Sequence, residues 1–182
     1  MVKPLDRSIG LLGGSFDPAH KGHLAISKIA INKIKLGKVL WVITNKNPFK
    51  IKPFYSISQR INKAKKITKG VKKIQVVYLD KAARSSRSID IINYLINKKK
   101  LKNIYFIIGS DNLIKLHKWK SWKKIVKLTK LIVFSRKGYD RRGRKSIVAK
   151  YLKNKIIFIN NRPISISSTK IKKQARISSQ WK

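Results

Sequence analysis

The chain has 182 residues, 42% of them hydrophobic, and its 46 lysines and arginines against 6 acidic residues give a formal charge of +40. This length and hydrophobic content predict one domain, residues 1–182, with a buried core. The absence of cysteine excludes disulfides and thiolate metal sites. No apolar run approaches the ~20 residues of a membrane helix, so we expect a cytoplasmic protein that makes no membrane contact.

Short apolar runs rich in β-formers alternate along the chain with amphipathic segments. The runs predict strands at residues 8–12, 39–44, 74–79, 104–108, 131–135 and 156–159. Apolar residues three or four apart predict helices at residues 24–36, 56–69, 89–98, 121–128 and 168–177. This alternation is typical of an α/β fold with a Rossmann-like, doubly wound, mostly parallel sheet flanked by helices. Residues 137–145, with two glycines and clustered arginines, are predicted to form a mobile loop.

The segment between the first predicted strand and helix, residues 13–23 (GGSFDPAHKGH), has the composition of a phosphate-binding turn. Gly13 and Gly14 allow the backbone to approach a phosphate, and free amides at the start of a helix favour an anion. His20 and His23 are three apart, so both rings are expected to face that anion and donate hydrogen bonds to it. A tight strand-to-helix turn without a ligand, or a metal-binding histidine pair, would use the same residues. The metal interpretation is disfavoured because a third ligand is hard to find.

Residues 14–23 closely resemble the GxFDPxHxGH signature of the HxGH nucleotidylyltransferases. Residues 166–172 (ISSTKIK) are similar to the ISSTxIR phosphate-binding motif of the same superfamily. The resemblance implies that His20 and His23 are catalytic. It also implies ATP binding by a larger set of residues: Gly13, Gly14, Ser15, Phe16, Arg136, Ser167, Ser168, Thr169 and Lys172.

The second motif departs from the superfamily pattern because Lys172 stands where an arginine is usual. Lysine keeps the charge but lacks the planar, bidentate guanidinium. Without the resemblance, Ser167, Ser168 and Thr169 would be interpreted as helix N-caps.

The middle of the chain narrows the resemblance to bacterial nicotinate-nucleotide adenylyltransferases. Similar stretches lie at residues 41–50 (with NPFK at 47–50), 84–90, 109–122 and 134–139. The resemblance implies that the mononucleotide is bound by Lys50, Ser88, Asp111 and Trp119. Ser88 would donate its hydroxyl to the pyridine carboxylate, Asp111 would bind a ribose hydroxyl, and the Trp119 ring would stack on the pyridine. Trp122 fits a core position as well as a ligand contact, because Leu113, Leu116, Trp119, Trp122 and Val126 share helical spacing.

The expected reaction transfers AMP from ATP to nicotinate mononucleotide and releases pyrophosphate in NAD biosynthesis, with Mg²⁺ arriving on ATP and no metal site in the protein. Adenylyl transfer to nicotinamide mononucleotide or phosphopantetheine, or cytidylyl transfer, stays open. So does a basic nucleic-acid-binding protein that retains the fold, or a weakly active enzyme.

The positive charge has two interpretations. It predicts nonspecific binding of polyanions through release of counterions. It also fits a compositional drift of the whole sequence toward lysine, isoleucine and asparagine, and we favour this second interpretation. Drift does not explain why all six acidic residues are aspartate and none is glutamate.

Overall fold

The computed structural model of the chain describes residues 8–45 and 53–161. Its centre is a six-stranded sheet in the order β3-β2-β1-β4-β5-β6, with parallel pairing throughout. The strands are β1 (Ser8–Gly14), β2 (Lys38–Ile43), β3 (Ile74–Val77), β4 (Asn103–Gly109), β5 (Lys130–Phe134) and β6 (Ile156–Ile159). The strand order reverses at β1. The carboxyl ends of β1 and β4 therefore flank the switch point at which open α/β sheets bind ligands.

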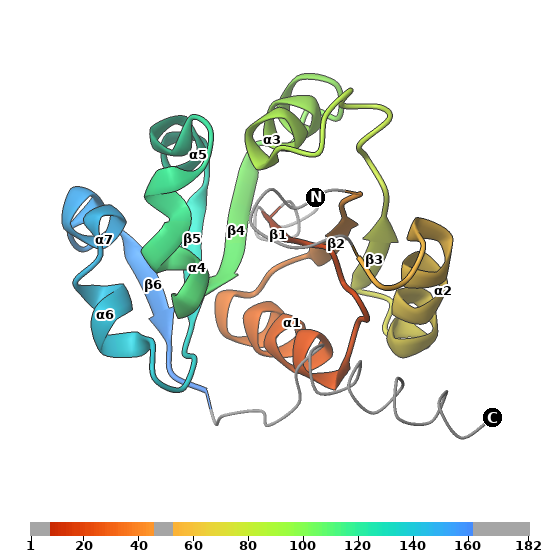
Figure 1. Cartoon of the computed structure of the whole chain (residues 1–182), viewed down its shortest axis with the longest axis horizontal. Helices are drawn as coiled ribbons and strands as arrows, with labels where there is room; N and C mark the ends of the chain where they lie inside the picture. Colours follow the sequence, from red (N-terminus) through yellow and green to blue (C-terminus); the bar gives the residue numbers. More distant parts are fainter. Residues whose placement is uncertain (1–7, 46–52, 162–182) are drawn as a thin grey trace, which may run out of the picture.

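Helices cover both faces of the sheet (Figure 1). Two longer helices, α1 (Lys21–Ile34) and α2 (Ile57–Thr68), pack on one face. The opposite face is covered by α3 (Ser88–Asn97), α4 (Ser110–Lys115), α5 (Trp122–Leu128) and α7 (Ile147–Leu152). In Figure 1, α1 lies below β1 and β2, and α3 lies above them. A 3₁₀ turn, η2 (Leu116–Lys118), follows α4, and α6 (Asp140–Arg144) follows β5.

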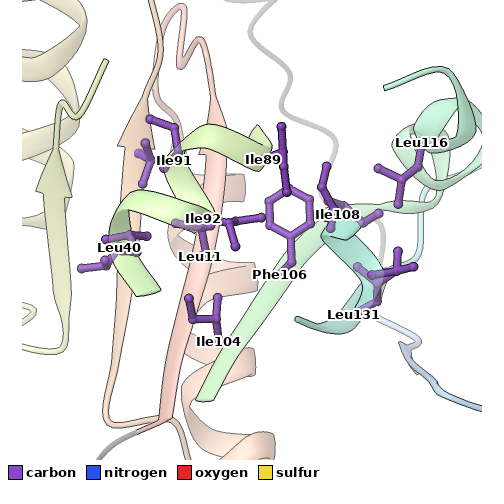
Figure 2. Packing of buried hydrophobic residues seen from close by; sticks show 14 of the residues in the cluster. Leu11, Leu40, Ile89, Ile91, Ile92, Ile104, Phe106, Ile108, Leu116 and Leu131 are labelled. Atoms are coloured by element: carbon purple, nitrogen blue, oxygen red, sulfur yellow. The ribbon is translucent and has the colours of Figure 1, made fainter. Parts of the chain in front are cut away.

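Two apolar clusters hold these layers together. On the α3 face, Ile89, Ile91 and Ile92 meet side chains of the central strands, among them Phe106 (Figure 2). On the α1 face, Trp41 is fully buried. Burying one such side chain contributes about 1.5–3 kcal/mol. The clusters fix the central strands, and with them the edge on which the site lies.

All six predicted strands are present, and each boundary agrees within two residues. The helices predicted at residues 24–36, 56–69, 89–98 and 121–128 correspond to α1, α2, α3 and α5, with α1 starting three residues earlier than expected. The helix predicted at residues 168–177 lies outside the described residues. Across residues 8–45 and 53–161, no helix is both long and apolar enough to traverse a membrane.

The prediction of a loop over residues 137–145 is wrong for its second half, which forms α6. The helix begins at Asp140, whose Oδ1 accepts a hydrogen bond from the Arg136 amide (2.9 Å). Burial raises the pKa of Asp140, but hydrogen bonds from Ser110 and from the Arg136 amide outweigh it and lower that pKa. Gly143 is buried against Ser110, where an added Cβ would lie 3.2 Å from the serine Cβ. This glycine therefore permits close helix packing.

Candidate active site

The turn from β1 into α1 holds both predicted catalytic histidines at the start of the helix. His20 is the N-cap of α1, and its Nδ1 accepts a hydrogen bond from the Gly22 amide (3.1 Å). His23 Nδ1 accepts one from the His20 amide (3.2 Å), which completes a capping box built from two imidazoles. The ring centroids are 3.9 Å apart. The two rings therefore share one place at the positive end of the α1 dipole.

Backbone contacts fix the tautomers of these rings. Because each Nδ1 accepts an N–H bond, a neutral ring carries its proton on Nε2. Burial, followed by the positive charge of Arg136, lowers the pKa of His20 to about 4. Its side chain is 8% exposed. At neutral pH, His20 is thus an uncharged Nε2–H donor.

Two linked hydrogen bonds anchor the first turn of α1 to the sheet. Trp41 Nε1 donates to Ser27 Oγ (2.8 Å), and Ser27 Oγ donates to the His23 carbonyl (2.8 Å). Phe16 stacks on Trp41, with 5.1 Å between ring centroids, and lies 4.7 Å from the His23 ring. Phe16, predicted to bind ATP, is 3% exposed. It supports the His23 ring from within the core.

Arg136 and Asp111 come together at the carboxyl ends of β5 and β4. Arg136 Nε lies 3.3 Å from Asp111 Oδ1 in an ion pair. Gly109 makes this possible, because an added Cβ there would collide with the Asp111 carboxylate and would lie 3.0 Å from Arg136 Nε. The sequence predicted Arg136 for ATP and Asp111 for a ribose hydroxyl. The structure places them in contact.

A small pocket of about 20 Å³ opens between β1, β2, β4 and the start of α3. Two predicted ligand-binding residues, Gly13 and Ser88, line it, together with Thr44 and the ring of Phe106. An added Cβ at Gly13 would meet nothing within 4 Å, so the pocket side of this glycine is open. A volume of this size holds about one water molecule. Any ring that enters must widen the pocket.

The two central tryptophans lie differently from each other. Trp119 packs edge-on against Phe106, with 6.2 Å between centroids, and the Phe106 ring lines the pocket. Trp122 packs edge-on against Tyr151 of α7 (5.1 Å) and belongs to the margin of the apolar cluster. The core interpretation of Trp122 is therefore the one that the structure supports.

Several predicted binding residues, namely Lys50, Ser167, Ser168, Thr169 and Lys172, lie outside the described residues. Their assignment stays a prediction. Within residues 8–45 and 53–161, no group of three or more histidine, aspartate or glutamate side chains could hold a metal ion.

Comparison with known proteins accords with this geometry. Residues 11–174 match the model of the cytidylyltransferase-like family. A probable nicotinate-nucleotide adenylyltransferase of Pelagibacter ubique is 45% identical over 180 residues, which cover 95% of this chain and 99% of that protein. The chain belongs to this family. A second member, from Nitratiruptor, is 39% identical over 72% of this chain and 75% of its own length.

Solved structures show the same fold. The nicotinic acid mononucleotide adenylyltransferase of Plasmodium falciparum, complexed with NaAD, aligns with a TM-score of 0.73 at 22% identity, covering 91% of this chain and 82% of that one. The same protein complexed with APC gives a TM-score of 0.70 at 21% identity, with the same coverage.

Sequence reasoning missed Arg60, which braces the turns around the site of this adenylyltransferase-family chain. Arg60 is 1% exposed, and its guanidinium donates to three carbonyls: Nη1 to Ser15 and Thr44 (2.7 Å each) and Nε to Tyr55 (3.1 Å). Burial lowers the pKa of Arg60, and Asp17 and Asp80 oppose the shift. Arg60, Ala64 and Thr68 are the buried residues of α2, at helical spacing. The sequence signal that could have revealed this role is an arginine at a position of α2 whose helical spacing predicts burial.

The two buried aspartates beside Arg60 were also missed as positioning groups. The Asp17 carboxylate accepts hydrogen bonds from the Phe54 and Tyr55 amides (2.9 Å each). Asp80 Oδ2 accepts from the Asn45 amide (2.8 Å) and from the Ser86 hydroxyl (2.5 Å). Both carboxylates thus tie the segment after one strand to a more distant part of the chain. Both follow strand ends in the sequence, but nothing in the sequence pairs them with their donors.

Proposed function

We propose that this chain transfers AMP from ATP to nicotinate mononucleotide, which gives nicotinate adenine dinucleotide and pyrophosphate. The observation that carries the proposal is the imidazole pair at the start of α1, with both Nδ1 atoms occupied by backbone amides. Two Nε2–H donors at the positive end of a helix suit phosphoryl oxygens. Family membership supports the same activity.

The chemistry needs alignment and charge neutralisation rather than a general base. An oxygen of the mononucleotide phosphate, already ionised, attacks the α-phosphorus of ATP. The bond from this phosphorus to the oxygen that bridges it to the β-phosphate breaks, and pyrophosphate leaves. His20 and His23 would stabilise charge on the α-phosphoryl oxygens. Arg136, next to Asp111, would bind the triphosphate, and Lys172 and the hydroxyls of residues 167–169 are proposed to complete its binding.

The described residues offer no cluster of three acidic or histidine side chains to a metal. Asp17 and Asp80 accept from backbone amides, and Asp111 is paired with Arg136. Mg²⁺ would therefore enter with ATP as part of that substrate.

The start of α3 favours the acid form of the pyridine ring. This helix begins at Ser88, which lines the pocket. Among the described residues no side chain caps its N-terminus, and the one acidic residue of its first turn is Asp90. A nicotinate carboxylate could accept from the serine hydroxyl and the first backbone amides, with the helix dipole favouring its charge. The uncharged amide would gain much less. Trp119 would support the ring through Phe106, and Lys50 and Asp111 are proposed to contact the mononucleotide.

The test is pyrophosphate release from ATP with nicotinate mononucleotide, compared with the amide mononucleotide, phosphopantetheine and a cytidylyl acceptor with CTP. We expect the highest kcat/KM for the nicotinate substrate. His23→Ala should lower kcat at least ~10²-fold, the scale of losing one transition-state donor. His117→Ala is the control, because this ring contacts the Ile114 carbonyl away from the imidazole pair. Near-normal turnover in His23→Ala, or faster turnover of another acceptor, would refute the corresponding part of the proposal.

A further inference from the structure

The amino ends of the strands carry a dense array of lysines. In a parallel sheet these ends share one edge, opposite the edge at which the candidate active site lies. Each strand from β2 to β6 begins with, or closely follows, at least two exposed lysines. These residues form what we call the amino-edge lysine surface: Lys35, Lys38, Lys69, Lys72, Lys73, Lys98, Lys99, Lys100, Lys102, Lys127, Lys130, Lys153 and Lys155.

The described acidic residues are segregated to the other edge. The described aspartates, which are Asp17, Asp80, Asp90, Asp111 and Asp140, all follow the carboxyl ends of strands or begin helices there. None of them is exposed. Within residues 8–45 and 53–161, the amino-edge lysine surface therefore contains no carboxylate to neutralise it. Among the described residues, no acidic side chain screens its positive potential.

Helix capping accounts for only part of this array. A cation near the C-terminus of a helix complements the dipole, and Lys35, Lys69 and Lys98 occupy the C-cap positions of α1, α2 and α3. The dipole effect fades within one turn, yet the chain continues through Lys99, Lys100 and Lys102. Adjacent like charges of this kind repel one another and destabilise the fold. An anionic partner would remove that cost.

A groove of about 400 Å³ lies in the middle of this surface. Its lining combines the aliphatic side chains of Ile96, Leu101 and Leu128 with Lys100, Lys102 and Lys127. The groove joins the end of α3 to the end of α5, so it continues the lysine array across two strands. The surface is therefore concave where its charge is dense.

We infer that the amino-edge lysine surface binds the phosphodiester backbone of duplex nucleic acid. Six strands about 4.8 Å apart give an edge of about 24 Å. A duplex presents one charge per about 1.7 Å, or about 14 phosphates over that length, so the charge densities of the two surfaces match. The lysines are point charges without a fixed hydrogen-bonding plane, which suits phosphates rather than base edges.

The composition of the surface sets its preference among polyanions. The segments that contribute these lysines contain no aromatic residue on which an unpaired base could stack, and the neighbouring ring of Tyr105 is partly buried and lies beneath Lys130 Nζ (5.4 Å). Of the exposed large apolar side chains among the described residues, Phe54, Tyr139 and Ile147 belong to other segments. Tyr151 lies two residues before Lys153, but its ring packs edge-on against Trp122 (5.1 Å), so one such side chain gives little support to insertion into a lipid surface. Binding is therefore independent of sequence, and duplexes bind more tightly than single strands of equal length.

The experiment measures binding of the full chain to 30-base-pair DNA and RNA duplexes, to the corresponding single strands, and to phosphatidylserine-containing vesicles, over a range of salt. One variant replaces Lys98, Lys100, Lys102 and Lys127 with glutamine. The matched control replaces Lys28, Lys115, Lys118 and Lys123, which are exposed and lie outside the amino-edge lysine surface. Both variants lose the same charge, and none of the substituted residues belongs to the candidate active site.

We expect the amino-edge variant to bind both duplexes at least about tenfold more weakly near physiological salt, with the slope of log K against log salt reduced by up to about 3–4. The control should keep most of the affinity, and pyrophosphate release should be unchanged in both. Equal losses in the two variants would show that binding is not localised and would overturn the inference. So would the absence of duplex binding, a preference for single strands, or vesicle binding that matches or exceeds duplex binding.

Discussion

At the scale of single residues, the unusual choice at the start of α1 is histidine as N-cap. Serine, asparagine and aspartate are the common caps because their oxygens accept the free helix amides. Here His20 Nδ1 accepts the Gly22 amide instead. An aspartate would satisfy the same amide but would repel a phosphate. Imidazole satisfies it without a negative charge and keeps an N–H donor for the ligand.

The lowered pKa of His20 makes stability depend on pH. The ring titrates near 6.5 when unfolded and near 4 when folded, so between these values the unfolded chain binds more protons. Acidification from pH 6.5 to 4 should therefore remove about 2–3 kcal/mol of stability through this ring. His20→Asn retains a cap acceptor. We therefore expect the unfolding free energy of His20→Asn, measured with urea, to fall between pH 6.5 and 4 by about 2–3 kcal/mol less than that of the wild type.

His117→Asn serves as the control for the loss of one imidazole outside the pair at the start of α1. Titration of the aspartates is common to all three proteins and cancels in the comparison. Parallel curves for His20→Asn and wild type would contradict a lowered pKa for His20.

The sequence predicted that the two histidine rings lie together, but it did not predict the partners of the other residues around them. Two histidines at i, i+3 after a glycine turn predicted a phosphate site, and the structure places their rings 3.9 Å apart. The pairing of Arg136 with Asp111 could not be foreseen, because it depends on where β4 and β5 end in space. Arg60 was missed for the same reason, since its partners lie on three separate turns.

At the scale of elements, the spacing of hydrophobic residues was enough to predict the strands and the longer helices. The central strands are buried on both faces and appear in the sequence as continuous apolar runs. α4, α6 and α7 are only five or six residues long, too short to display a helical period. Their existence depends on packing, such as Gly143 against Ser110, that only the folded chain provides.

Arg60 joins elements that are distant in the sequence, so its removal should loosen the whole carboxyl edge. Arg60→Ala would leave three buried carbonyls without their donor and two neighbouring carboxylates without their cation. We expect the unfolding free energy to fall by about 3–5 kcal/mol. Arg60→Lys should recover part of this loss, since an ammonium keeps the charge but lacks the guanidinium geometry. Urea unfolding measures both.

Lys63→Ala is the control on the same helix, because Lys63 is exposed and lies over the Tyr55 ring. It should cost no more than about 1 kcal/mol. A cost below about 1 kcal/mol for Arg60→Ala would show that Arg60 does not brace these turns.

At the scale of the whole molecule, the charge of +40 opposes compaction. Unfolding separates the charges, so screening should stabilise the folded state. Raising the ionic strength from about 0.02 to about 0.2 M shortens the Debye length from about 20 to about 7 Å. We expect Tm to rise by about 3–8 °C, measured by scanning calorimetry in sodium chloride.

The variant with four glutamines on the amino-edge lysine surface should show a smaller rise, because it begins with less repulsion. Sucrose at matched osmolality is the control for effects that do not involve charge. A Tm that stays constant or falls as salt is added would contradict this prediction. It would mean that attraction within ion pairs, rather than repulsion between like charges, is the larger electrostatic contribution to folded-state stability.

The burial of Trp41 gives the protein a built-in optical reporter. Its indole is fully shielded, stacks on Phe16 and lies 5.9 Å from the His23 ring. Emission from such a ring is blue-shifted and sensitive to nearby quenchers, whereas Trp119 and Trp122 are only partly shielded. When a nucleotide reaches His23, the change in local field should alter the fluorescence of Trp41. Occupancy of the site could then be followed in real time without a label.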